Sequence, residues 1–181
     1  PYLIAIRAHQ DANDHPAALA IALRFVQRFP SLPRANFEYA YELNRAGRAV
    51  EGLPFLKKAM ESDGTYEEPF FLYGEMLARE GKWSEAAAAF RKAIELRSDY
   101  PAARLALGKA LMSARKYDEA RSELLRAAQL NPTHPQPHLL LSQLYFRLGQ
   151  EELSAKEKQL SLQLRREHPD LMESPQSRPY P

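Results

Sequence analysis

Cysteine is absent from the 181 residues of the sequence. This absence excludes disulfide bonds, thiolate metal sites and cysteine nucleophiles. It leaves the compartment undetermined, because chains without cysteine occur both in the cytoplasm and in the periplasm. We therefore expect a soluble chain whose localisation the sequence does not specify.

Long hydrophobic runs are also missing. The most apolar stretch, residues 86–90, is far shorter than the roughly 18 apolar residues that a membrane-spanning helix requires. We therefore expect no insertion into a membrane. The chain begins with Pro1 rather than methionine, which indicates a fragment or a processed form of a longer protein.

Charge of one sign is not in excess. The sequence has 25 lysines and arginines against 23 aspartates and glutamates, a formal net charge of +2. A balance this close to zero argues against a protein that coats nucleic acid, although the sequence pI is about 8.9. We therefore expect no nucleic-acid partner.

The common catalytic motifs are absent as well: there is no glycine-rich phosphate loop, no nucleophile elbow and no HExxH sequence. His134 and His138 have the i, i+4 spacing of a metal-binding pair on a helix. Pro135 and Pro137 lie between them, however, and no acidic residue is near in the sequence, so we expect two surface residues of a loop and a first helical turn. The sequence predicts no catalytic residue, no metal and no cofactor.

A period of 34 residues organises what is present. Only seven glycines occur, and five of them fall on two phases of this period, with three prolines on a third. The prolines, Pro33, Pro101 and Pro135, define repeat units at 33–66, 67–100, 101–134 and 135–168. The glycines are Gly47, Gly81 and Gly149 on one phase and Gly74 and Gly108 on the other.

Positions within a unit are counted from these first residues. Apolar residues recur at helical spacing on both sides of position 15, which holds glycine in every unit except 101–134, where it is Arg115. Each unit therefore reads as two helices of about 13 residues joined by a tight turn. Small residues at positions 8 and 20, such as Gly108 and Ala120, allow the two backbones to approach closely. One helix pair cannot bury its apolar face alone, so neighbouring units must stack.

The two ends of the array depart from this pattern. Residues 1–32 read as a degenerate first unit, with the turn at residues 13–15. In 135–168, Ser154, Lys158 and Ser161 replace small or apolar residues, which predicts a capping helix that faces water. We therefore expect one array over 1–168, followed by a proline-rich tail at 169–181.

This pattern resembles the tetratricopeptide repeat family. The clearest copy reads Phe70-x2-Tyr73-Gly74-x2-Leu77, followed by Ala86-x3-Phe90-x2-Ala93. The resemblance implies an all-α fold: a right-handed α-solenoid of about five helix–turn–helix repeats, with about ten helices, no sheet and a C-terminal capping helix. The shared residues are packing residues, so the resemblance is informative about fold and less so about function.

The resemblance also implies a binding surface, because in this family the first helices of the units line a concave groove. Transferring those positions gives a largely apolar floor with an arginine edge. The implied groove residues are Phe37, Tyr41, Arg45, Phe71, Leu72, Glu75, Arg79, Leu105, Lys109, Met112, Leu139, Gln143, Phe146 and Arg147.

One branch of the family holds the C-terminal carboxylates of chaperones with a clamp of lysine, asparagine and arginine. The corresponding positions here hold Phe37, Tyr41, Leu72, Ala102 and Ala106, so the clamp is absent. The sequence therefore favours a non-catalytic interaction module or scaffold that binds a peptide or helix of a partner protein in an apolar groove. Two alternatives stay open: a regulatory or substrate-docking domain of a larger enzyme encoded upstream and, less well supported, a reader of RNA.

Overall fold

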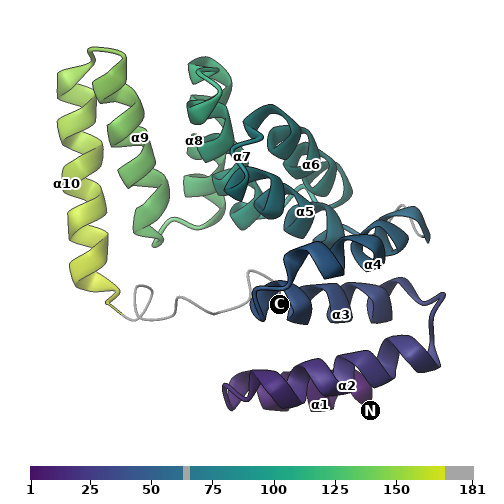
Figure 1. The fold of residues 1–181 in the computed structure, drawn as a ribbon. Helices are drawn as coiled ribbons and strands as arrows, with labels where there is room; N and C mark the ends of the chain where they lie inside the picture. Colours follow the sequence, from purple (N-terminus) through teal and green to yellow (C-terminus); the bar gives the residue numbers. More distant parts are fainter. Residues whose placement is uncertain (63–65, 170–181) are drawn as a thin grey trace. The chain divides into compact units, whose positions relative to one another are not determined.

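A computed structural model describes residues 1–62 and 66–169, which form ten helices and no strand (Figure 1). The predicted all-α fold is confirmed over these residues. The expected tail lies, from residue 170 on, outside the described residues. The helices are α1 (Tyr2–Asp11), α2 (His15–Arg28), α3 (Pro33–Arg45), α4 (Ala49–Ser62), α5 (Glu68–Arg79), α6 (Trp83–Leu96), α7 (Pro101–Ser113), α8 (Tyr117–Leu130), α9 (Pro135–Arg147) and α10 (Glu151–Glu167).

The chain divides into two compact units, Pro1–Met76 and Leu77–Pro181. In the first unit, α1 packs on α2, α2 on α3 and α3 on α4. In the second unit, α6 packs on α7, α7 on α8, α8 on α9 and α9 on α10. Each unit is therefore built from helix hairpins whose neighbours in space are also neighbours in sequence, as repeat proteins require.

The turn inside each hairpin has the same backbone conformation. Asn13, Gly47, Gly81, Arg115 and Gly149 all have a positive φ, between 57° and 75°. These residues are separated by multiples of 34, so the structure extends the period to residues 1–32 and fixes the register of that degenerate unit. Glycine adopts this left-handed conformation without strain, whereas asparagine and especially arginine adopt it at a cost.

The Arg115 turn shows why a left-handed residue is needed there. After α7 ends, the backbone N–H of Lys116 donates to the carbonyl of Leu111 at 2.9 Å, and the N–H of Arg115 donates to that of Met112 at 3.2 Å. This pair of bonds is the Schellman motif, which satisfies the last carbonyls of a helix. The motif forms here despite arginine at the strained position.

Small residues sit where paired helices approach, as predicted. In the first unit, a Cβ added to Gly52 would lie 3.0 Å from the carbonyl oxygen of Ala40. In the second unit, a Cβ on Gly108 would lie 2.6 Å from Cδ2 of Leu124, and Ala120 beside it is fully buried. The volume that glycine leaves free at position 8 is thus filled by the large residue at position 24.

The first repeat reverses this arrangement. Ile6 and Ala22 stand at positions 8 and 24, three periods before Gly108 and Leu124. Ile6 is 1% exposed and Ala22 is fully buried, and both belong to one core cluster with Phe25. The bulky side chain has moved from the second helix to the first, and the small one from the first to the second. The two pairs differ by only one methyl group in summed side-chain size, so most of the volume is compensated, as a close-packed interior favours.

A buried polar cluster joins the start of α5 to α3 within the first unit. The Arg34 guanidinium donates to Glu38 at 2.8 Å and to Glu68 at 2.6 Å, and it lies over the rings of Phe37 and Tyr66. Glu38 and Glu68 are both buried. Burial raises the pKa of Glu68, and the neighbouring Arg34 acts in the opposite direction by favouring the carboxylate.

The two histidines near the start of α9 have separate structural roles. His134 is the N-cap of α9, and its Nδ1 accepts the backbone N–H of Gln136 at 3.2 Å. His138, in the first turn as expected, is largely buried rather than at the surface, and its Nδ1 contacts Glu157 of α10 at 2.7 Å. Among residues 1–62 and 66–169, no three histidine or acidic side chains gather as they would around a metal ion.

The strained turn residue gives the first prediction. Arg115→Gly removes the steric cost of a side chain at φ 60°, and we expect it to stabilise the chain by about 0.5–1 kcal/mol. Arg115→Ala removes the same charge but keeps a Cβ, so it should give no comparable gain. The measurement is the midpoint of urea unfolding for both variants. Equal midpoints would show that the left-handed conformation carries no strain.

The exchange of volumes gives a second prediction. Gly108→Ala alone should destabilise the chain by roughly 1–3 kcal/mol, because its Cβ clashes with Leu124. In a Leu124→Ala background the clashing atoms are gone, and the same change should stabilise by up to about 1 kcal/mol through the helix propensity of alanine. A double-mutant cycle by chemical unfolding measures both effects. The same sign in both backgrounds would contradict the proposed packing.

The His134 cap gives a third prediction. Burial lowers the pKa of His134 below its usual value of about 6.5, and its Nδ1 must stay unprotonated to accept the Gln136 N–H. Its contribution is therefore fully present above the unfolded-state pKa and is lost as the pH falls below it. His134→Asn keeps an acceptor that does not titrate in this range. The unfolding midpoint of this variant should fall less than that of wild type between pH 7.5 and 5.5; an equal fall would remove His134 as the cause.

Candidate binding surface

Three predicted groove residues of the first unit lie in a row along α3. The rings of Phe37 and Tyr41 lie 5.9 Å apart, and the Arg45 guanidinium lies 5.9 Å from the centre of Tyr41. Phe37 is completely buried, whereas Tyr41 and Arg45 are half-buried. Arg45 also contacts Nε2 of His15 on α2 at 3.2 Å. This row of side chains is therefore packed within the unit, and only the end formed by Tyr41 and Arg45 is partly exposed.

Four of the predicted groove residues prove to be interior. Phe71, Leu72 and Met112 are 3%, 0% and 3% exposed, and Phe37 is 0% exposed. Their burial corrects the expectation of an accessible floor, because a ligand does not reach these side chains without moving helices. Helical periodicity identifies an apolar position but does not distinguish an open surface from a contact between helices. Replacing Phe71 therefore tests stability rather than binding.

The remaining predicted residues are at least partly accessible. Leu105 of α7 and Glu75 of α5 are half-buried, while Lys109 and Arg79 are exposed. None of these four lines the pocket described next. The structure thus separates the predicted set into interior residues, scattered accessible residues and one group that it brings together.

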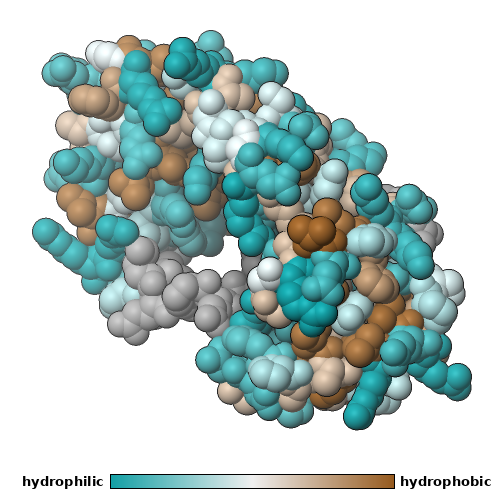
Figure 2. All heavy atoms as spheres, viewed as in Figure 1, coloured by the Kyte–Doolittle hydropathy of each residue, from teal (hydrophilic) through white to brown (hydrophobic). Residues whose placement is uncertain are grey.

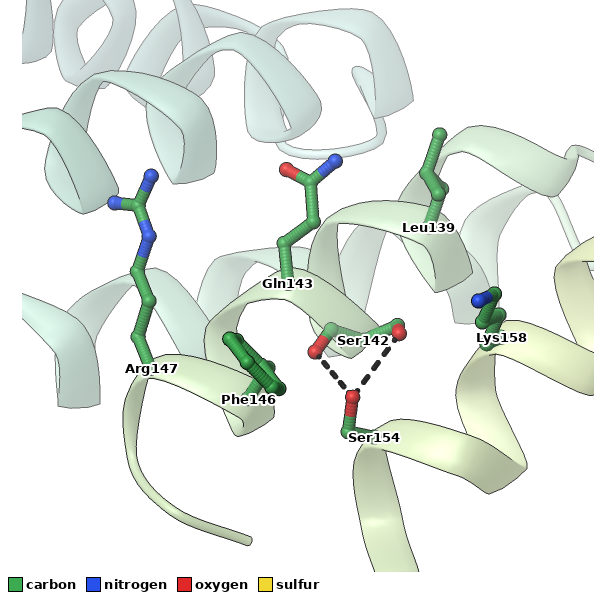
Figure 3. A pocket seen from close by; sticks show the side chains of 7 residues that line it. All are labelled: Leu139, Ser142, Gln143, Phe146, Arg147, Ser154 and Lys158. Atoms are coloured by element: carbon green, nitrogen blue, oxygen red, sulfur yellow. Dashed lines mark hydrogen bonds between the residues drawn. The ribbon is translucent and has the colours of Figure 1, made fainter. Parts of the chain in front are cut away.

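That group lies on the last helix hairpin. A pocket of about 340 Å³ opens between α9 and α10, and four predicted residues line it: Leu139, Gln143, Phe146 and Arg147. Figure 3 shows Leu139, Gln143 and Arg147 extending from the same side of α9, with Phe146 beside them and Lys158 across on α10. The i, i+4, i+8 spacing of the first three explains this alignment.

Three lining residues were missed as part of a site: Ser142, Ser154 and Lys158. The Ser154 hydroxyl donates to the Ser142 carbonyl at 2.9 Å and lies 3.3 Å from the Ser142 hydroxyl (Figure 3). These serines stand at positions 8 and 20, where the units at 33–66, 67–100 and 101–134 have glycine or alanine. In the sequence, serine at these positions indicated only a capping helix and not a binding site.

Two further contacts hold α10 against α9. The Ser161 hydroxyl donates to the Pro135 carbonyl at 3.0 Å in a buried position, and His138 contacts Glu157. The polar residues of α10 thus do not all face water as a capping helix would suggest, since Ser161 is 3% exposed. With both helices fixed, the pocket between them is a pre-formed feature.

Phe146 is the most exposed aromatic side chain at this pocket. It is 71% exposed, whereas apolar residues inside the hairpin, such as Leu141 and Leu144, are completely buried. Figure 2 shows the exposed hydrophobic residues of α9 and α10 as separate brown spots among hydrophilic ones. An apolar anchor in a largely polar surround is typical of an interface that forms and dissociates.

The known proteins that resemble the chain agree on its fold. Residues 77–144 match the sequence model of the tetratricopeptide repeat. No curated protein matches the sequence. No helix among the described residues is both long and apolar enough to cross a membrane.

Several solved structures are similar over most of the chain. PilF from Pseudomonas aeruginosa has a TM-score of 0.80 at 17% identity, covering 96% of this chain and 86% of that one. MamA from Desulfovibrio magneticus has a TM-score of 0.78 at 14% identity, covering 97% and 96%. YrrB, described as a TPR protein with an unusual peptide-binding site, has a TM-score of 0.74 at 18% identity, covering 96% and 90%.

Identities this low establish the fold alone, because one fold serves many functions. The sequence match and the helix hairpins support each other, because the matched residues contain the turns at Gly81 and Arg115 that repeat the same backbone geometry. The resemblance inferred from the sequence is thus confirmed: residues 77–144 match the tetratricopeptide repeat, and the described chain is similar in fold to solved tetratricopeptide repeat structures.

Proposed function

We propose that this chain is a non-catalytic interaction module that binds an apolar segment of a partner protein at the α9–α10 pocket. The observation that carries the proposal is Phe146, an aromatic side chain 71% exposed beside a pocket of about 340 Å³. Aromatic anchors seated at pockets supply most of the binding energy in many interfaces. Leu139 provides a second apolar contact within the same pocket.

The polar lining residues have a different role in this proposal. Arg147 is exposed at the pocket, and exposed ion pairs contribute only about 0–1 kcal/mol. Charges at the edge of an interface act mainly on orientation and association rate. We therefore assign affinity to Phe146 and Leu139, and ligand direction to Arg147 and Gln143.

A docking domain of a larger enzyme would use the same surface, because such a domain also recognises a protein segment. That alternative makes the same predictions for Phe146 and Arg147. The two readings differ in what the ligand is attached to, not in how the pocket binds it.

The test compares matched substitutions against a partner captured with the full chain as bait. Phe146→Ala should weaken binding at least tenfold, the loss expected for a hot-spot residue. The control is Leu125→Ala on α8, where an apolar side chain is 40% exposed but does not line the pocket. Both variants should keep the wild-type circular dichroism spectrum and unfolding midpoint within error, because both side chains are exposed.

Salt dependence separates the roles of the lining residues. Arg147→Ala should cause a smaller loss than Phe146→Ala, and this loss should shrink as ionic strength rises and screens the charge. Titrations at two salt concentrations measure both effects. If Phe146→Ala binds like wild type while Leu125→Ala abolishes binding, the interaction surface lies elsewhere and the proposal fails.

A further inference from the structure

The last hairpin exposes a face that the preceding hairpin keeps covered. Met112 of α7 and Phe146 of α9 occupy the same repeat position, 34 residues apart. Met112 is 3% exposed, whereas Phe146 is 71% exposed. The difference follows from the packing order, since α9 contacts α7 as well as α8. Within the second unit, no further described helix packs in the corresponding place on α9 and α10.

The second helices show the same contrast. Leu124 of α8 is completely buried at position 24, where it fills the space beside Gly108 of α7, and α9 packs against α8. The residue at this position of α10 is Lys158, which is exposed and lines the pocket. The element that covers this face in the preceding repeat is a helix. The α9–α10 face is therefore shaped to accept a helix rather than an arbitrary extended segment.

Positive charge at this face is not neutralised. Arg147 and Lys158 both line the pocket, and neither forms an ion pair with any residue in the described parts of the chain. The nearest acidic residue in sequence, Glu157, is instead engaged by His138. Position 24 holds Leu56, Phe90 and Leu124 in the other regular units, so the lysine is specific to the last one.

We propose that this face binds an acidic amphipathic helix of a partner protein. The helix would lie where the first helix of a following repeat would stack. Its apolar side chains would contact Phe146 and Leu139, and its carboxylates would pair with Lys158 and Arg147. This inference rests on the proposed function and extends it, because it names the conformation and charge of the partner segment.

A second copy of this chain offers a helix of the right kind but the wrong charge. Ile4 and Ala8 of α1 are exposed at positions 6 and 10, where Leu72 and Ala110 are buried in other units. The first turn of α1 carries no acidic residue, however. Elsewhere α1 has a single carboxylate and the basic Arg7, so this helix would neutralise Lys158 and Arg147 poorly. An acidic helix of another protein is the better occupant.

The test uses two synthetic helical probes with the sequence of α7, which itself packs as a first helix on the helix before it. The acidic probe carries Ala106→Glu and Lys109→Glu, and the basic probe carries Ala106→Lys. A lactam bridge on the outer face holds each 13-residue peptide helical, because free peptides of this length are only marginally so. Circular dichroism of the free probes verifies equal helicity.

Fluorescence anisotropy with the full chain should show the acidic probe binding at least tenfold more tightly than the basic probe at low salt. Lys158→Glu should reverse that order, and Phe146→Ala should weaken both probes. Equal binding of the two probes to wild type and to Lys158→Glu would overturn the proposal, as would no binding of either. Self-association in sedimentation velocity that is lost in both Phe146→Ala and Ile4→Asp would also overturn it, in favour of a second copy.

Failure of this inference is distinguishable from failure of the proposed function. If a captured natural partner depends on Phe146 but binds equally to wild type and to Lys158→Glu, the pocket is an interaction site and the acidic helix is wrong. If Phe146→Ala does not change the binding of that partner, both the proposed function and the acidic-helix inference are wrong.

Discussion

The structure depends on one constraint: two helices in a hairpin approach so closely that the volumes at positions 8 and 24 must complement each other. Gly108 satisfies it with Leu124, and Ile6 satisfies it with Ala22 by exchanging the large and small members. In the last hairpin, Ser142 at position 8 is instead joined to Ser154 at position 20 by a hydrogen bond. Because each hairpin is held this way, it can present its outer side chains at fixed positions to the next hairpin or to a ligand.

The fold could be predicted from the sequence because its determinants recur with a regular period. Turn glycines, small residues and prolines recur every 34 residues, and the structure places helix starts at Pro33, Pro101 and Pro135. The exchange of Ile6 and Ala22 was hidden, since a period of residue types detects repetition and not compensation. The sequence places the turn of this unit at residues 13–15, and the left-handed conformation of Asn13, a backbone property that composition does not report, fixes the register.

The site was accessible only in part, for a related reason. The resemblance supplied repeat positions, and the pocket contains Leu139, Gln143, Phe146 and Arg147 from that set. Some of the same positions elsewhere are interior, as Met112 shows, because accessibility depends on whether another helix lies beyond. Which member of a periodic set is exposed is a property of neighbours, and identical positions in a repeat have different neighbours at its ends.

The packing of α10 has a consequence for how the chain fluctuates. Among the described helices α10 packs mainly against α9, whereas α7, α8 and α9 each have a helix on both sides. In a structure stabilised by nearest neighbours, a helix with one neighbour opens more readily than the rest, and its amide hydrogens exchange with solvent sooner. A ligand that occupies the α9–α10 face supplies the missing neighbour. Binding there therefore also determines how often the last hairpin unfolds locally, and with it the exposure of this segment to proteases.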